Sequence, residues 1–453
     1  MGGDYSLADL RQWDERICQV VEKAGLGCYP QEFEICSYED MLGYEAYQGM
    51  PARYSHWSFG KAYERTRTFY RYNLVGLPYE MVINSNPCLA YLMKDNTLLL
   101  QILTMAHVYA HNDFFKNNRL FKTGTRAEYT LEMFKSHARR IQQYVADPGI
   151  GAAKVEKVLD AAHALRLQVY RTVGEKWLSD EEKKQRLIER SQVREREHPL
   201  LELPEEKELP DLNRIPLEPE EDLLLFLYKY GRLNDWERDI LQIVREESLY
   251  FLPQIETKIM NEGWASYWHY RLLKQLKLPQ ELHLEFLKRH NQVIRPLEGD
   301  LNPYHIGFKI FEELEREHPD EPDFIFAVRE HERDFSFLMR FLTRELCQEL
   351  KLFQYAKRGR DYVVNEVSDE KGWKIIRNTL AGNVGISGIP NIIAMEVKGK
   401  NNTLMLDHEW SSRELNMEYA HQTLKHIAFL WKGKVQLRTV VRTAYQLLES
   451  DGG

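Results

Sequence analysis

The spacing of apolar residues predicts a mainly helical protein up to about Leu352. The strongest segment covers 96–118, where apolar residues surround the first three turns on every side. A helix that is apolar all round is buried on all its faces. We therefore expect a buried helix capped by Asn96, with further helices over 9–25, 127–145 and 152–175.

The last part of the chain changes to short alternating segments that are typical of strands. The predicted order is strand 361–366, helix 373–380, strands 389–397 and 403–410, helix 415–431 and strand 435–441. This order matches a ferredoxin-like βαββαβ domain. The sequence thus predicts an α+β fold that is mainly helical and ends in a small ferredoxin-like domain.

A proline-rich, acidic segment over 197–222 separates two helical regions. Its five prolines prevent a continuous helix, and its acidic excess keeps it solvated, so we interpret it as a linker or a loop draped over the surface. The expected domains are 1–196 (helical), 197–222 (linker), 223–355 (helical, packed on the first) and 356–453 (ferredoxin-like).

Net charge, apolar runs and cysteine content limit the partners and the cellular compartment that we expect for the protein. The net charge of −8 and the pI near 6.1 disfavour a nucleic-acid binder that relies on a basic surface. No apolar run is long enough to span a membrane, and the first residues lack the pattern of a secretory signal. The five cysteines include no C-x-x-C pair, which fits a reducing compartment. We expect a cytoplasmic protein without a nucleic-acid partner or a membrane span.

Two histidines in the buried helix are candidate metal ligands. His107 and His111 are four residues apart, and residues at this spacing share a helix face with Cβ atoms about 5–6 Å apart. Two imidazoles so placed can bind one metal ion at about 2.0–2.1 Å. The alternative is a pair of hydrogen-bonded core histidines, because H-x-x-x-H is a short pattern.

Glu262 supplies a third candidate ligand. Its string asparagine–glutamate–glycine–tryptophan–alanine resembles the second zinc segment of the gluzincin metallopeptidases. Their first segment is H-E-x-x-H, whereas Val108 stands here in place of the catalytic glutamate. We therefore predict zinc or another divalent ion on His107, His111 and Glu262, in a zincin-like region without the usual general base. The alternative is a buried Glu262 paired with an arginine such as Arg271.

Three other residues are candidates for supporting this chemistry. His269 falls two turns after Glu262 on the same helix face, about 10 Å along the axis, where it would line a cleft and transfer protons. Tyr304 stands at a proline-marked helix start, where its phenol would stabilise an oxyanion or simply pack at the helix end. Asp113 would either orient a histidine ligand or face solvent at the end of its helix.

Five long strings give the chain a resemblance to a known family: YSHWSFGK from Tyr54, INSNPCLAYLM from Ile83, HVYAHNDFFKNN from His107, KIMNEGWASYWHY from Lys258 and LNPYHIGF from Leu301. With LDHEW and LRTVV near the C-terminus, they resemble the stage V sporulation protein R (SpoVR) family over nearly the whole chain. The resemblance implies a cytoplasmic bacterial protein associated with the spore cortex, a thick peptidoglycan layer. It also implies two partners, a serine kinase of the PrkA type and a von Willebrand-like protein, but no established reaction.

Two functions compete on these grounds. One is a metal-dependent hydrolase, an amidase or peptidase, with metal ligands His107, His111 and Glu262 and with His269 or Tyr304 in catalysis. The other is a non-enzymatic regulatory protein that works with the kinase and whose centre is a polar network or a structural metal. The three ligand types favour the first function, and the missing glutamate and the extra C-terminal domain favour the second.

Overall fold

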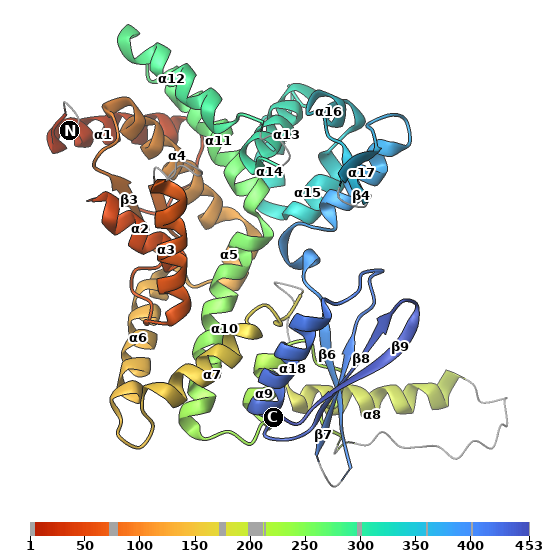
Figure 1. Cartoon of the computed structure of the whole chain (residues 1–453). Coiled ribbons are helices and arrows are strands. Elements are labelled where there is room, and N and C mark those ends of the chain that lie inside the picture. The colour runs from red at the N-terminus through yellow and green to blue at the C-terminus, as the bar shows by residue number, and fades with distance from the viewer. Residues whose placement is uncertain are drawn as a thin grey trace. The chain divides into compact units, whose positions relative to one another are not determined.

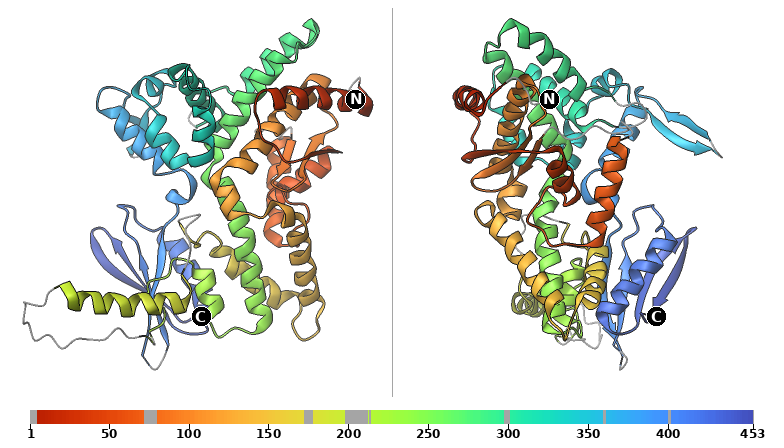
Figure 2. Two further views of the ribbon diagram at one scale, coloured as in Figure 1. Left: turned by 180° about the vertical axis from the view of Figure 1, so that it is seen from behind. Right: turned by 60° about the vertical axis from the view of Figure 1, so that its left-hand side comes forward.

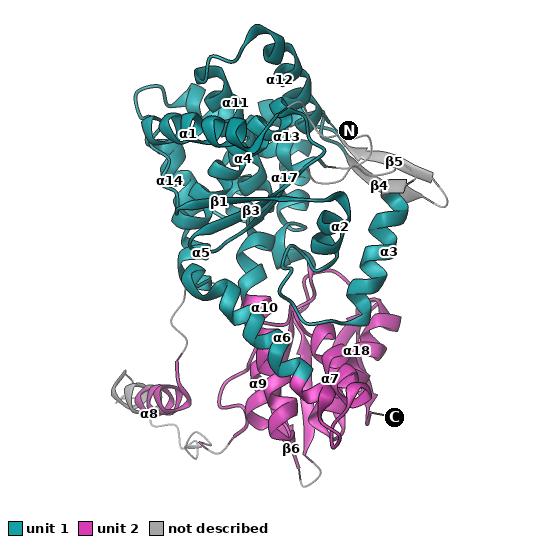
Figure 3. Cartoon of the chain, turned by 90° about the vertical axis from the view of Figure 1, so that its left-hand side faces the viewer, with its two compact units in different colours: residues 1–142, 250–388 teal, residues 143–249, 389–453 magenta. Residues whose placement is uncertain are grey.

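Four chain segments combine into two structural units (Figure 3). The computed structural model describes residues 5–71, 80–171, 178–197, 212, 214–296, 301–358, 361–399 and 402–452. Unit 1 joins Met1–Gln142 to Tyr250–Gly388, and unit 2 joins Gln143–Leu249 to Ile389–Gly453. These boundaries differ from those expected from the sequence, because local patterns do not reveal which distant segments pack together. Most of the expected linker, 198–211 and 213, lies outside the described residues.

Unit 1 is a helical assembly with a small sheet (Figure 1). Helices α6 (Thr130–Ala146) and α10 (Asp235–Glu256) cross into unit 2. The other helices are α1 (Leu7–Lys23), α2 (Tyr38–Ala46), α3 (Trp57–Arg71), α4 (Leu98–Asn117), α5 (Arg119–Gly124), α11 (Lys258–Gln275), α12 (Gln280–Val293), α13 (Pro303–Glu317), α14 (Phe324–His331), α15 (Asp334–Phe341), α16 (Arg344–Glu349) and α17 (Gly372–Ala381), with a 3₁₀ turn at Ala127–Tyr129.

Helix α4 is the buried helix that the apolar pattern predicts. Its side chains from Leu99 to Phe115 are all buried, and its first turn packs into the main hydrophobic core of unit 1. The N-cap is Thr97 rather than the expected Asn96, because the Thr97 hydroxyl accepts the hydrogen bond from the Leu100 amide. The prediction of the helix is confirmed, and the cap is corrected by one residue.

A three-stranded sheet lies beside α4 and has the order β1-β3-β2. Strand β1 (Gln31–Cys36) pairs in parallel with β3 (Cys88–Met93), and β2 (Glu80–Ile83) pairs with β3 in the antiparallel direction. Strand β2 is therefore an edge strand among the described residues. Its first residue lies close to the histidine-bearing turns of α4, which matters for the site below.

Helix α11 packs between α4 and α13. Glycine residues permit its close contact with α13. A Cβ atom built on Gly263 would lie 2.3 Å from the Cα atom of Gly307 on α13. Two backbones can approach so closely only when neither residue carries a side chain. This approach brings the N-terminal end of α13 beside the turn of α11 that carries Glu262 and Gly263.

Unit 2 contains a four-stranded sheet with the order β6-β7-β8-β9. Strands β6 (Ile392–Lys398) and β7 (Thr403–His408) pair antiparallel, β7 and β8 (Val435–Val441) pair in parallel, and β8 and β9 (Ala444–Ser450) pair antiparallel. Helix α18 (Met417–Trp431) lies along one face of this sheet (Figure 2). The unit also holds α7 (Ala152–Ala164), α8 (Asp180–Glu197) and α9 (Leu223–Tyr230).

The ferredoxin-like strand arrangement is wrong, although the α+β class is correct. The predicted first strand exists as β5 (Asp361–Glu366), but it pairs with β4 (Gln354–Arg358) in a separate two-stranded sheet of unit 1. A hairpin between neighbouring segments closes a short loop and costs little chain entropy. Strand β9, which the sequence analysis did not predict, completes the larger sheet through a turn in which Arg442 and Thr443 both have positive φ. Without glycine or asparagine this turn gave no hairpin signal. No helix among the described residues is long and apolar enough to cross a membrane.

Candidate metal centre

Two imidazole rings on α4 form the core of the site. The centroids of His107 and His111 are 4.6 Å apart, and both side chains are buried. Nδ1 of His111 lies 2.8 Å from the side-chain oxygen of Asn261, and Nδ1 of His107 lies 2.9 Å from Nδ1 of His269. Each ring is thus held through Nδ1, which leaves Nε2 directed toward the neighbouring carboxylates.

The hydrogen bond to Asn261 fixes the tautomer of His111. An amide oxygen only accepts hydrogen bonds, so Nδ1 of His111 carries the proton and donates it. The neutral ring then keeps a lone pair at Nε2, which is the form that binds a metal ion. Burial, reinforced by His107, lowers the pKa of His111 to about 4, so the ring is neutral at pH 7.

Glu262 of α11 faces both Nε2 atoms. Its Oε2 lies 3.5 Å from Nε2 of His111 and 3.9 Å from Nε2 of His107. Burial alone would raise the pKa of Glu262, but the two histidines lower it, so the carboxylate is ionised at neutral pH. This buried oxygen has no hydrogen-bond partner among the described residues. The structure therefore brings the three predicted ligands together and leaves one carboxylate oxygen unsatisfied between two imidazoles.

Edge strand β2 adds a carboxylate that the sequence analysis missed. Oε1 of Glu80 lies 3.8 Å from Nε2 of His107, and the ligand atoms of Glu80, His107 and His111 all lie within 4.8 Å of one another. Burial raises the pKa of Glu80, and the charge of Glu262 raises it further, whereas His107 lowers it. A single glutamate at the start of a short strand has no distinguishing local pattern, so only the packing of β2 beside α4 reveals it.

The donor set fits a divalent metal ion. Ligand atoms about 2.0–2.1 Å from a tetrahedral ion are separated from one another by about 3.4 Å. Nε2 of His107 lies 3.9 Å from the Glu262 oxygen and 3.8 Å from the Glu80 oxygen, and Nε2 of His111 lies 3.5 Å from the Glu262 oxygen; these three separations are close to that value. Neutral imidazoles and ionised carboxylates are also the ligand types that zinc and similar ions take. The unsatisfied oxygen of Glu262 is the atom that such an ion would satisfy.

His269 lies behind His107 rather than in a cleft. Its side chain is fully buried, with Nδ1 bonded to His107 and Nε2 lying 2.8 Å from Nδ1 of His290. Burial lowers the pKa of His269 well below its usual value, and burial and Lys274 lower the pKa of His290 to about 4. The result is a row of hydrogen-bonded imidazoles. This position suits orienting the ring of His107 better than reaching a substrate.

Tyr304 stands at the start of α13, close to Glu262. Its ring is stacked near that of His107, with centroids 6.1 Å apart and planes inclined by 27°. The negative charge of Glu262, together with burial and Glu80, raises the pKa of Tyr304 well above its usual value. The phenol therefore keeps its proton at neutral pH and remains a hydrogen-bond donor beside the candidate ligands.

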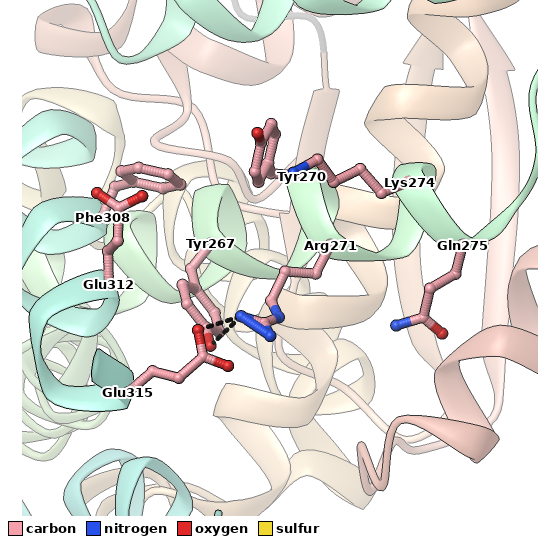
Figure 4. A pocket seen from close by; sticks show the side chains of 8 residues that line it. All are labelled: Tyr267, Tyr270, Arg271, Lys274, Gln275, Phe308, Glu312 and Glu315. Carbon is pink, nitrogen blue, oxygen red and sulfur yellow. Dashed lines mark hydrogen bonds and ion pairs between the residues drawn. The ribbon is translucent and has the colours of Figure 1, made fainter. Parts of the chain in front are cut away.

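Arg271 and Asp113, two charged residues near the candidate ligands, do not have the partners that the sequence suggested. Arg271 does not pair with Glu262: it forms an ion pair with Glu315 and donates a hydrogen bond to Tyr267, beside a pocket of about 270 Å³ between α11 and α13 (Figure 4). Asp113 neither orients a histidine nor faces solvent. It is fully buried, where it accepts hydrogen bonds from the Gly27 amide and from the Trp264 indole.

Comparison with known proteins gives matches over almost the entire chain. A family model described as SpoVR like protein matches residues 4–389, and a second, described as SpoVR-like C-terminal domain, matches residues 390–442. A relative from Escherichia coli (strain K12), named Uncharacterized protein YcgB, is 34% identical over 475 residues, covering 96% of this chain and 92% of the relative. No solved structure matches the chain.

Proposed function

This chain belongs to the SpoVR family, which makes it a sporulation-related protein, and we propose that it is a metal-dependent hydrolase of amide or peptide bonds. We propose further that it acts in the cytoplasm, on a precursor or fragment of the spore-cortex peptidoglycan. One observation carries the proposal: the buried Oε2 of Glu262 has no hydrogen-bond partner among the described residues, yet it lies between two Nε2 atoms.

In this proposal His107, His111 and Glu262 hold the ion. A divalent ion there polarises a carbonyl group and acidifies a water molecule. Asn261 and His269 form hydrogen bonds with the Nδ1 atoms of the two histidines, which keeps Nε2 of each ring directed toward Glu262. His269, predicted from the sequence to be catalytic, is in this view a positioning residue.

Glu80 supplies the carboxylate that the valine at position 108 cannot. Its Oε1 lies 3.8 Å from Nε2 of His107, and burial raises its pKa above the usual value of a glutamate. Glu80 would take the proton of the attacking water at Oε1 and return it to the leaving nitrogen as the C–N bond breaks. Tyr304 would donate its phenolic hydrogen bond to the oxygen on which negative charge develops. The base thus comes from an edge strand instead of the helix that carries the histidines.

Glu80 also supports a second proposed function, that of a non-enzymatic regulator with a structural metal site. If Glu80 binds the ion directly, four protein ligands close the site, as in structural zinc centres. The protein would then be a non-enzymatic regulator, for which the kinase of the PrkA type and the von Willebrand-like protein are the proposed partners. The two functions therefore differ in what Glu80 does.

Metal analysis of purified Glu80→Gln protein separates the two functions. For the hydrolase we expect about one equivalent of zinc or a similar ion in both wild type and variant, and a loss of about 10² to 10⁴ in the hydrolysis of peptidoglycan peptides by the variant. For the closed site, the variant loses the ion. In both cases His107→Ala combined with His111→Ala removes it. A folded wild-type protein that neither contains nor takes up a divalent ion would refute both.

A further inference from the structure

A basic pocket of about 480 Å³ lies in unit 1, where the ends of α15, α16 and α17 meet. Four cationic side chains and two acidic ones line it around a tryptophan: Arg340, Arg344, Lys374, Arg377, Glu345, Glu370 and Trp373. The chain as a whole carries a net charge of −8, so a cationic excess here does not follow from composition. Local excess charge of this kind attracts an anionic ligand.

The positive charge of the pocket is only partly neutralised by neighbouring carboxylates. Arg340 forms an ion pair with Glu332, and Arg344 forms one with Glu345 at 3.1 Å. Lys374 and Arg377 have no carboxylate partner among the described residues. Both lie on α17, one turn apart, so two cations share one face of a helix without a counter-charge. Such an arrangement is unfavourable unless a ligand or solvent ions balance it.

Trp373 provides a fixed surface within this cationic group. The ring packs partly against the hydrophobic core of unit 1, which holds its orientation. The guanidinium carbon of Arg377 lies 4.9 Å from the ring centroid, and Nζ of Lys374 lies 5.8 Å from it. A guanidinium stacked on an aromatic ring keeps the N–H groups at its edge free for an anion. Two N–H groups of Arg377 also donate to the side-chain oxygen of Asn378 at 3.4 Å, so stacking and this contact order the guanidinium while its other N–H groups remain for an anion.

We propose that this pocket binds a phosphate monoester. Three of its four cations are arginines, whose planar forks match the oxygens of a phosphate dianion. The volume exceeds what a bare phosphate needs, which leaves room for an organic group against Trp373. With Glu345 and Glu370 against four cations, the lining carries a net charge of +2, which one phosphate dianion balances. Neither the pocket nor its ligand is part of the metal centre.

Calorimetric titration of the full chain tests this proposal with four ligands: adenosine monophosphate, a tripeptide with a central phosphoserine, the same tripeptide with glutamate, and inorganic phosphate. We expect at least one phosphate ester to bind more tightly than the glutamate peptide and than inorganic phosphate, with an affinity that falls as salt is added. Tighter binding of the nucleotide would indicate that its base stacks on Trp373, and tighter binding of the peptide would indicate a phosphoprotein ligand.

Charge-reversal variants locate the binding. Lys374→Glu and Arg377→Glu should each weaken the preferred ester by about ten- to hundredfold, since each removes a charge-assisted hydrogen bond. Lys374 is exposed and Arg377 is half-buried at the pocket, so folding is retained and is checked by thermal unfolding. The matched control is Lys425→Glu on exposed surface of α18 in unit 2, which should not change the affinity. Absence of binding by both esters, equal binding of the glutamate peptide or of inorganic phosphate, or equal loss in the control would overturn the proposal.

Discussion

Helices α4 and α11 meet around two buried carboxylates, and the surroundings of the two groups differ. Asp113 on α4 accepts hydrogen bonds of 2.8 Å from the Gly27 amide and 2.9 Å from the Trp264 indole, and it lies 3.5 Å from Arg329. Glu262 on α11 has an oxygen with no hydrogen-bond partner among the described residues. Both carboxylates bear a desolvation cost, which hydrogen bonds and Arg329 reduce for Asp113 and which the two neighbouring histidines oppose for Glu262.

This difference distinguishes a carboxylate with structural partners from the candidate metal ligand on the same pair of helices. Burial raises the pKa of Asp113 to about 6, although Arg329 opposes the shift, and its polar partners come from three separate segments. A group satisfied in this way ties segments together and needs nothing further. A buried carboxylate left unsatisfied, and ionised by neighbouring histidines, indicates a missing positive partner.

The largest effect should come from neutralising the satisfied carboxylate. Asp113→Asn leaves the buried charge of Arg329 unpaired, so the free energy of unfolding should fall by about 3–5 kcal/mol. In metal-free protein, Glu262→Gln should cost less, because the neighbouring histidines can release a proton whereas the Arg329 guanidinium stays charged. Urea unfolding of both variants measures the contrast. Equal destabilisation by the two substitutions would show that the carboxylates do not differ.

A somewhat smaller effect is expected at the glycine contact between α11 and α13. The Cβ atom of Gly263→Ala would lie 2.3 Å from Gly307, so the two helices must separate, at a cost of about 1–3 kcal/mol or more. Because Gly263 lies between Glu262 and Trp264, the shift should disturb both carboxylates. Gly43→Ala, where a Cβ atom meets nothing within 4 Å, is the control. Thermal unfolding measures both, and an unchanged midpoint for Gly263→Ala would contradict the close approach.

The hydrogen bond that orients His111 should affect metal affinity. Asn261→Leu removes the acceptor for Nδ1, and loss of such a partner typically weakens metal binding by about 10- to 100-fold. Asn261→Asp keeps an acceptor in the same place and should restore the affinity. Competition with a chelating dye measures both constants. Similar weakening by both substitutions would mean that Asn261 acts through packing and not through its oxygen.

The smallest effect concerns acid stability through His290. Its pKa is lowered to about 4 in the folded protein from 6.5, so the unfolded chain takes up the proton first as pH falls. The stability that His290 contributes is present above about pH 6.5 and is lost as pH falls toward 4. The comparison is between the free energies of unfolding of metal-free wild type and metal-free His290→Asn protein. The difference between the two should become smaller by about 1 kcal/mol when the pH is lowered from 6.5 to 5. A difference between the two proteins that does not change with pH would contradict this expectation.

Much of the fold and part of the site were predictable from local patterns. The apolar pattern predicts α4 to within two residues at its start, and alternation predicts β6, β7 and β8. The spacing of His107 and His111 and the string around Glu262 predict three residues that the structure brings together. The predictions failed at strand pairing, where β5 joins β4 and the unpredicted β9 completes the sheet, because pairing depends on partners rather than on each strand's own residues.

By itself, the sequence determined which groups are candidate ligands and which helices present them, since side-chain type and helical period are local properties. Only the tertiary structure decided how those groups are used. The packing of β2 beside α4 adds Glu80 to the site, and the contact of α11 with α12 sets His290 behind His269. The same packing gives Asp113 its three partners and leaves an oxygen of Glu262 without one. Whether a buried charge is satisfied depends on distances between segments that are far apart in the chain, and no local pattern records those distances.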